Sequence, residues 1–242
     1  MNNIFLLAKR ELGYYLNTIW GYAILAIILV IDGILFNTFA MGANTERYST
    51  DVLQDFFFFS SGTTMIAGVL IAMRLLAEER SNGTAALLET APISEAQIIA
   101  GKYLGAFGFL SIITLCTLYM PFLIEINGKV SWAHIGAGYL GLLLLGGTSV
   151  AIGTFSSAIA KNQIFASLLG ASILVLLLLG WLLGKTTDAP LSDLFSYTAL
   201  FDRHYQPFMR GRINTESIFF YLSTSFVFLL LSTRILQSRR IS

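Results

Sequence analysis

The chain has 242 residues, of which 55% are hydrophobic and 12% are charged, and its mean hydropathy is +0.72. Soluble domains carry about 25% charged residues, so this composition excludes an ordinary soluble domain. A net charge of +1 without any Lys/Arg-rich run argues against nucleic acid as a partner. The single cysteine, Cys116, excludes an intramolecular disulfide framework. These features indicate an integral membrane protein.

Six continuous apolar runs divide the chain. A bilayer core of roughly 30 Å requires about 20 apolar residues in a helix, and each run is close to that length. Transmembrane β-strands would instead alternate apolar and polar residues over about 10 positions. We therefore predict an all-α, polytopic membrane protein in which residues 1–242 form a single transmembrane domain. The six predicted spans are residues 19–40, 56–76, 103–126, 135–156, 163–183 and 218–236.

The basic residues at the two ends of the chain indicate its orientation. Lys9 and Arg10 precede the first span, and Arg239 and Arg240 follow the last one. Basic residues stay on the cytoplasmic side, and an even number of spans returns the chain to that side, so we predict that both termini are cytoplasmic. The first span is too long for the apolar part of a cleaved signal. These features favour a multi-pass protein of a bacterial inner (plasma) membrane, with residues 184–216 as an outer loop.

The segment before the first span, residues 1–18, is amphipathic. At 100° per residue, Ile4, Phe5, Ala8 and Leu12 share one arc of a helix, and Lys9 lies outside that arc. This pattern predicts a helix in the membrane interface. The alternative is a basic flank that only fixes the topology.

Residues 77–101 form a longer connection than two adjacent helices need. Asn82 and Gly83 break the preceding helix, and Pro92 ends a short helical stretch that begins at Thr84. Ser94, with Gln97 three residues later, predicts a capping box at the start of the next helix. Leu87 and Leu88 then lie on a short helix outside the membrane. Such leucines either bind a partner or pack against the protein's own helix ends.

The same connection resembles the loop between the second and third helices of ABC type-2 exporter permeases. The resemblance rests on an acidic pair with Arg, a Gly-Thr step, a Leu-rich turn and a Thr-Ala-Pro stop, followed by Lys and Tyr. It extends to an N-terminal Lys-Arg-Glu-Leu with two tyrosines, to Phe208–Ile213 and to the basic tail. The loop residues are Glu78, Glu79, Arg80, Gly83, Thr84, Leu87, Leu88, Thr90, Ala91, Pro92, Lys102 and Tyr103, and the N-terminal ones are Lys9, Arg10, Glu11, Leu12, Tyr14 and Tyr15.

This resemblance implies specific roles for both segments. Residues 83–91 would be the coupling helix that sits in a groove of a separate ATPase subunit, and the N-terminal stretch would be the interfacial helix. Short outer helices are implied between Asp188 and Ile213. In length and layout the chain is most similar to gliding-motility-associated permease subunits. The implied coupling residues are Glu79, Gly83, Thr84, Leu87, Leu88, Thr90 and Pro92, and the implied interfacial-helix residues are Lys9, Arg10, Glu11 and Tyr14.

The resemblance also implies the partners of the chain. They are ABC ATPase subunits, a second copy or a related permease subunit, and membrane lipid. Gly141 to Thr148 imitates the spacing of a phosphate-binding loop, but Gly147 stands in place of the lysine and the segment lies in a span. We therefore expect no cofactor, no metal and no ATP hydrolysis on this chain, with ATP and Mg bound by the partner ATPase. The alternatives are an ATP-independent secondary transporter or channel, and a non-transporting scaffold that drives an envelope or motility machine.

Asp32 and a pair of glycines are the notable residues inside the spans. Asp32 is the only carboxylate well inside a span, about 12 Å from its outer end. A charged side chain at that depth usually faces a cavity or a partner, although Asp32 could also reach the outer interface. Gly101 and Gly105 form a small-x-x-x-small pattern, which predicts close packing between helices.

Overall fold

The computed structural model describes residues 2–41, 48–83, 93–128, 130–188 and 191–241. Helices make up its secondary structure, and no strand occurs within these ranges. The all-α prediction is therefore confirmed. The helices are α1 (Asn2–Asn17), α2 (Ile19–Leu35), α3 (Ser49–Ala72), α4 (Arg74–Ser81), α6 (Glu95–Cys116), α7 (Tyr119–Asn127), α8 (Trp132–Ile159), α9 (Gln163–Leu178), α10 (Gly180–Thr186), α11 (Leu191–Thr198), α12 (Gln206–Met209) and α13 (Thr215–Ile241), with π-helical turns η1 (Phe36–Met41) and η2 (Leu200–Tyr205).

Five helical segments of the described chain are long and apolar enough to cross a membrane. Two of them join consecutive helices: Ser49–Ser81 combines α3 with α4, and Glu95–Ile126 combines α6 with α7. A sixth candidate is the pair α9 and α10, which passes the same test together but bends by 44° at Leu179. The prediction of a multi-pass helical protein is thus confirmed, with five spans or six if the bent pair counts as one.

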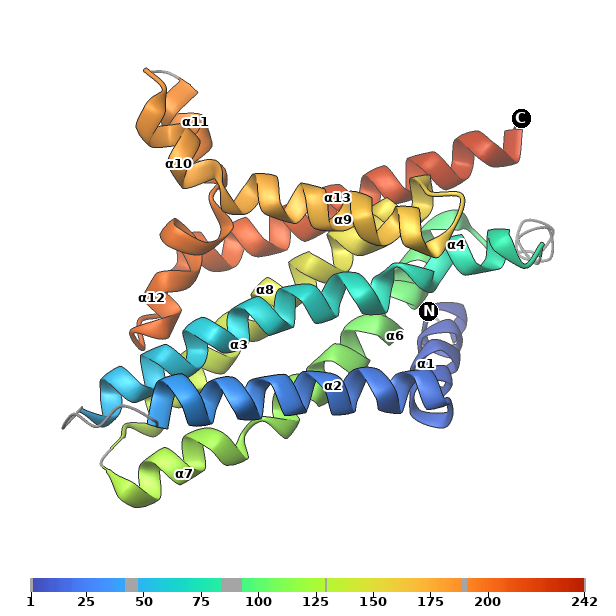
Figure 1. Ribbon diagram of the computed structural model, residues 1–242. Helices are drawn as coiled ribbons and strands as arrows, with labels where there is room; N and C mark the ends of the chain where they lie inside the picture. The colour runs from blue at the N-terminus through green and yellow to red at the C-terminus, as the bar shows by residue number, and fades with distance from the viewer. Residues whose placement is uncertain (1, 42–47, 84–92, 129, 189–190, 242) are drawn as a thin grey trace.

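The helices run back and forth along one axis (Figure 1). α2, α6 and α9 run in one direction, and α3, α8 and α13 return in the other. As a result, α1, the end of α4 and the C-terminal part of α13 all lie at the same end of the bundle. We call this the α1 end. The opposite end holds α7, α10, α11 and α12.

α8 is the central helix of the bundle. In its most apolar stretch 78% of the residues are buried, whereas only 22% are buried in the corresponding stretches of α2 and α13. Small residues let neighbours approach α8 closely: a Cβ added at Gly153 would lie 2.6 Å from the Cβ of Ala72 in α3. Membrane helices pack through such small residues because lipid supplies no hydrophobic force between them. The apolar outer faces of α2 and α13 suit contact with lipid or another subunit.

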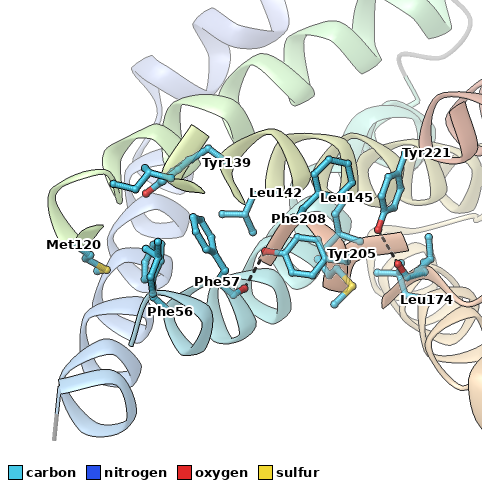
Figure 2. Packing of buried hydrophobic residues seen from close by; sticks show 14 of the residues in the cluster. Phe56, Phe57, Met120, Tyr139, Leu142, Leu145, Leu174, Tyr205, Phe208 and Tyr221 are labelled. Atoms are coloured by element: carbon cyan, nitrogen blue, oxygen red, sulfur yellow. Dashed lines mark hydrogen bonds between the residues drawn. The ribbon is translucent and has the colours of Figure 1, made fainter. Parts of the chain in front are cut away.

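Aromatic side chains fill the core near the opposite end (Figure 2). The ring of Phe57 packs edge-on against Tyr139, with 5.6 Å between ring centroids. The Tyr205 hydroxyl donates to the Phe57 carbonyl at 3.0 Å, and the Tyr221 hydroxyl donates to the Leu200 carbonyl at 2.7 Å. Buried phenols require such partners. These two bonds fix η2 against α3 and α13.

Residues 184–216, predicted as an outer loop, are largely helical where the structure describes them. α11, η2 and α12 follow one another between α10 and α13. Gly211 has a φ of +72° and ends this run of short helices, a conformation that favours glycine. His134 Nε2 lies 2.6 Å from the carbonyl of Met209, which ties α12 to the start of α8.

Candidate functional site

Four charged side chains meet at the α1 end, and we call them the ion cluster: Arg10, Glu11, Glu79 and Lys102. Lys102 Nζ lies 3.0 Å from Glu11 Oε1 and 2.8 Å from Glu79 Oε1. Arg10 Nη2 lies 3.1 Å from Glu11 Oε1 and 3.6 Å from Glu79 Oε1. The cluster joins three helices, because Arg10 and Glu11 belong to α1, Glu79 to α4 and Lys102 to α6.

The ion cluster is buried at its centre and open at its edge. Lys102 is 1% exposed and Glu11 is 6% exposed, whereas more than half of the Arg10 side chain is exposed. A buried charge is tolerated when it is paired and hydrogen-bonded, as Lys102 is here. Burial by itself raises the pKa of the Glu11 carboxyl, but the charges of Lys102 and Arg10 outweigh it and hold the pKa below its usual value. Two cations thus balance two carboxylates.

Two glycines of α6 allow α1 to reach Lys102. A Cβ added at Gly105 would lie 2.6 Å from the Cβ of Glu11 and 2.8 Å from the Ala8 carbonyl. A Cβ added at Gly101 would lie 2.6 Å from the Cβ of Leu7. Distances below 3.0 Å cannot be accommodated without movement. The Gly101–Gly105 pattern therefore packs helices closely, as predicted, and its partner is the N-terminal helix.

A second set of contacts attaches α1 to α3 and α4. The Arg74 guanidinium lies 3.4 Å from the ring centroid of Tyr14 and pairs with Glu78 at 2.6 Å. The Tyr15 hydroxyl donates to the Ile71 carbonyl at 2.8 Å. An Arg over an aromatic face is attracted by the ring quadrupole. α1 is therefore anchored through its aromatic residues as well as through the ion cluster.

α4 is also attached to α8. The Ser157 hydroxyl accepts from the backbone N–H groups of Leu76 and Ala77, both at 3.0 Å, and donates to the Met73 carbonyl at 2.8 Å. These bonds satisfy backbone groups at the break between α3 and α4. Arg80 donates to the Ala160 carbonyl at 2.7 Å. α4 therefore contacts α1, α6 and α8 together.

Residues 84–92 lie outside the described residues, and Asn82 and Gly83 separate them from the end of α4 at Ser81. They include the predicted coupling residues Thr84, Leu87, Leu88, Thr90 and Pro92. The residues on both borders are described. Gly83, with a φ of +70°, follows the end of α4 in a backbone conformation that favours glycine. Ser94 and Gln97 form a capping box at the start of α6, which confirms that prediction.

The remaining predicted residues lie in different surroundings. Lys9 is exposed and is not part of the ion cluster. It borders a largely apolar groove of about 630 Å³ between α1 and α6, together with Phe5 and Leu104. Asp32 is buried in α2, where its Oδ1 lies 2.6 Å from the Thr63 hydroxyl of α3. Among the described residues, no group of three or more His, Cys, Asp and Glu side chains could hold a metal.

No local pattern in the sequence shows that the four members of the ion cluster meet. Arg10 and Glu11 belong to the predicted interfacial helix, and Glu79 and Lys102 belong to the segment that resembles the coupling loop. Arg74 and Ser157 lie outside the predicted sites, because such residues are common at helix ends and in spans. The only pattern that pointed to this packing is the spacing of Gly101 and Gly105.

The fold and the ion cluster define a class: a polytopic helical membrane protein with an N-terminal helix that packs on the ends of its spans. The family model described as ABC-2 family transporter protein matches residues 16–180, more than half of the chain. The chain therefore belongs to the ABC-2 transporter family, whose domain is a membrane component rather than a catalytic one. This match carries no information about gliding motility. A search of curated proteins finds no match to the chain.

Proposed function

We propose that the chain is the permease subunit of an ABC exporter in a bacterial inner membrane. Two such subunits, identical or related, form the translocation path, and separate ATPase subunits bind ATP and Mg and drive it. The α1 end is cytoplasmic in this proposal. Three observations support it: the family match, the presence of both chain ends at the α1 end, and the basic residues in both ends.

The proposed coupling path begins at residues 83–91, which dock on the ATPase. The single observation that carries this path is the ion cluster, because it joins α4, the last described helix before residues 83–91, to both α1 and α6. A displacement of α4 is transmitted to α1 and α6 through Lys102, and to α8 through Ser157. α1 lies in the interface, where exposed apolar residues such as Phe5 and Leu6 contact lipid.

Substitution of Leu87→Asp together with Leu88→Asp tests the proposal. Loss of a buried leucine contact costs about 2–5 kcal/mol, and an unpaired carboxylate in an apolar groove adds a desolvation cost. Since each 1.4 kcal/mol is about tenfold in affinity, the double variant should lose the ATPase almost completely. The measurement is co-purification of an ATP-binding subunit with the tagged chain, identified by mass spectrometry and by ATPase activity.

A matched control adds a carboxylate elsewhere at the α1 end. Asn162 caps α9 by accepting from the Phe165 N–H at 2.8 Å, and Asp is an equally good cap, so Asn162→Asp should retain the ATPase. A monodisperse peak in detergent shows that each variant is folded. If the folded double variant recovers as much ATPase as wild type, residues 83–91 are not the coupling element.

Co-purification with the wild-type chain also tests the first alternative, because a secondary transporter or channel would recover no ATPase. Reconstitution of the chain with its ATPase in vesicles tests the second alternative. A scaffold in an envelope or motility machine would retain the ATPase but export nothing.

A further inference from the structure

Asp32 lies in an uncharged pocket inside the bundle. Its side chain is 5% exposed and lines a cavity of about 10 Å³, room for the centre of one water molecule. The other lining residues come from α2, α3, α6, α8 and the turn after α6, and none of these described residues is Lys, Arg or His; the polar ones are Ser60, Thr64, Thr114 and Thr117. An ionised carboxylate in such a place lacks a cation to offset its desolvation.

The hydrogen bonds around Thr63 give an independent indication. Thr63 Oγ1 lies 2.6 Å from Asp32 Oδ1 and 3.1 Å from the Ser60 carbonyl oxygen. A threonine hydroxyl carries one hydrogen. With an ionised Asp32, that hydrogen is shared between two acceptors. With a neutral Asp32, the acid donates to Thr63 and Thr63 donates to Ser60, so that both contacts are full hydrogen bonds.

We propose that Asp32 is a proton-binding site: it holds a proton while α2 packs against α3, and it donates this proton in a hydrogen bond to Thr63. The uncharged cavity and the relay from Asp32 through Thr63 to Ser60 carry the proposal. The neutral acid explains how α2 keeps this residue buried without a counter-ion from the described part of the chain.

Thr63 also provides the exit for the proton. It lines a groove of about 510 Å³ between α2, α3, the α9–α10 pair and η2, together with Ile31, Trp181 and Asp202. Separation of α2 from α3 exposes the Asp32 acid to water in this groove. The O–H bond of the acid then breaks, the proton passes to water, and the carboxylate remains. Proton release would thus accompany opening of the bundle, a role that rests on the proposed exporter function, whereas the protonation itself does not.

The other titratable groups near Asp32 add no positive charge. Asp202 of η2 lines the groove that Thr63 also lines, and it is a carboxylate rather than a cation. Tyr139 of α8 hydrogen-bonds at 3.0 Å with Thr117, which lines the cavity, and Tyr119 of α7 lies near Gly33. α6 contributes no titratable side chain to the cavity.

Infrared spectroscopy of the purified chain in lipid tests the proposal without a transport assay. At about pH 7 the wild-type spectrum should contain the C=O stretch of a protonated carboxyl group that shifts in D2O. Asp32→Asn should abolish this band. Asp51→Asn, which removes an exposed carboxylate in the first turn of α3, should leave it unchanged.

If the Asp32→Asn variant does not fold, the Thr63→Val variant still tests the proposal. The variant removes only the partner hydroxyl, so the acid loses its acceptor and its C=O band should move to higher frequency. Thr63→Ser should restore the wild-type position. Absence of the band from wild type, or a band that none of the Asp32 and Thr63 variants alters, would overturn the proposal. Both results are independent of whether an ATPase binds, so failure here and failure of the exporter proposal are distinguishable.

Discussion

Lys102 is 1% exposed and is paired with Glu11 and Glu79, so its charge matters more than that of an ordinary surface lysine. Surface ion pairs contribute about 0–1 kcal/mol, whereas removal of one partner from a buried pair leaves an uncompensated charge in the interior. Sequence patterns identified Glu11 and Lys102 as charged residues near helix ends. Their contact joins positions 91 residues apart, which no local pattern encodes.

Substitution of Lys102→Met, which keeps an unbranched side chain but removes the charged ammonium group, should destabilise the chain by about 3–5 kcal/mol. The reason is that Glu11 stays buried without its main cation. Thermal unfolding in detergent or lipid measures the effect. The control is Lys161→Met, which removes an exposed lysine and should change stability by less than about 0.5 kcal/mol. Equal stability of the two variants would show that the ion cluster does not hold the helices together.

At the scale of elements, α1 is a helix packed against the bundle rather than an unpacked basic segment before the first span. It packs along α6 through Gly101 and Gly105, and it is attached to α3 and α4 through Tyr15 and Arg74. The amphipathic pattern of residues 1–18 predicted a helix, and α1 is a helix from Asn2 to Asn17. The pattern could not show where its apolar face would lie, because lipid and α6 are equally apolar partners.

Two glycine substitutions in α6 should distinguish close packing from helix propensity. Gly105→Ala places a methyl group 2.6 Å from the Glu11 Cβ and 2.8 Å from the Ala8 carbonyl, so α1 must move; we expect a loss of about 1–3 kcal/mol. Gly108→Ala meets Leu12 at an ordinary 3.8 Å and should be neutral or stabilising by about 0.5–1 kcal/mol. Thermal unfolding measures both. A Gly105→Ala variant as stable as Gly108→Ala would contradict the observed contact between α1 and α6.

At the scale of the whole molecule, both chain ends lie at one end of the bundle. The pair α9 and α10 is the candidate for a sixth membrane span, and it is bent. The apolar runs predicted the crossings, whereas the bend of 44° falls directly before Gly180, where the backbone closely approaches the Phe195 carbonyl. The connections between consecutive helices set the direction in which each helix runs along the bundle. The basic residues at the two chain ends predict the orientation of the bundle in a membrane, and a direct measurement can test that prediction.

Thiol labelling in intact cells should show this orientation. In a Cys116→Ser background, single cysteines at the exposed positions Thr50 and Asn214, opposite the α1 end, should react with an impermeant reagent. Cysteines at the exposed positions Ser81 and Ser238 should react only after the cells are opened. Labelling of Ser81→Cys in intact cells would reverse the orientation and place residues 83–91 on the side of the membrane that lacks ATP.

The sequence by itself determined that the chain is helical, crosses a membrane several times, breaks a helix at Asn82 and Gly83 and starts another after Ser94. These features depend on local chemistry: apolar length, a glycine conformation and a capping box. Only the tertiary structure decided that Lys102 pairs with Glu11 and Glu79, that α1 packs on α6, and that Asp32 faces hydroxyl groups rather than a cation. Such contacts join residues far apart in the chain, and they depend on which faces of equally apolar helices meet.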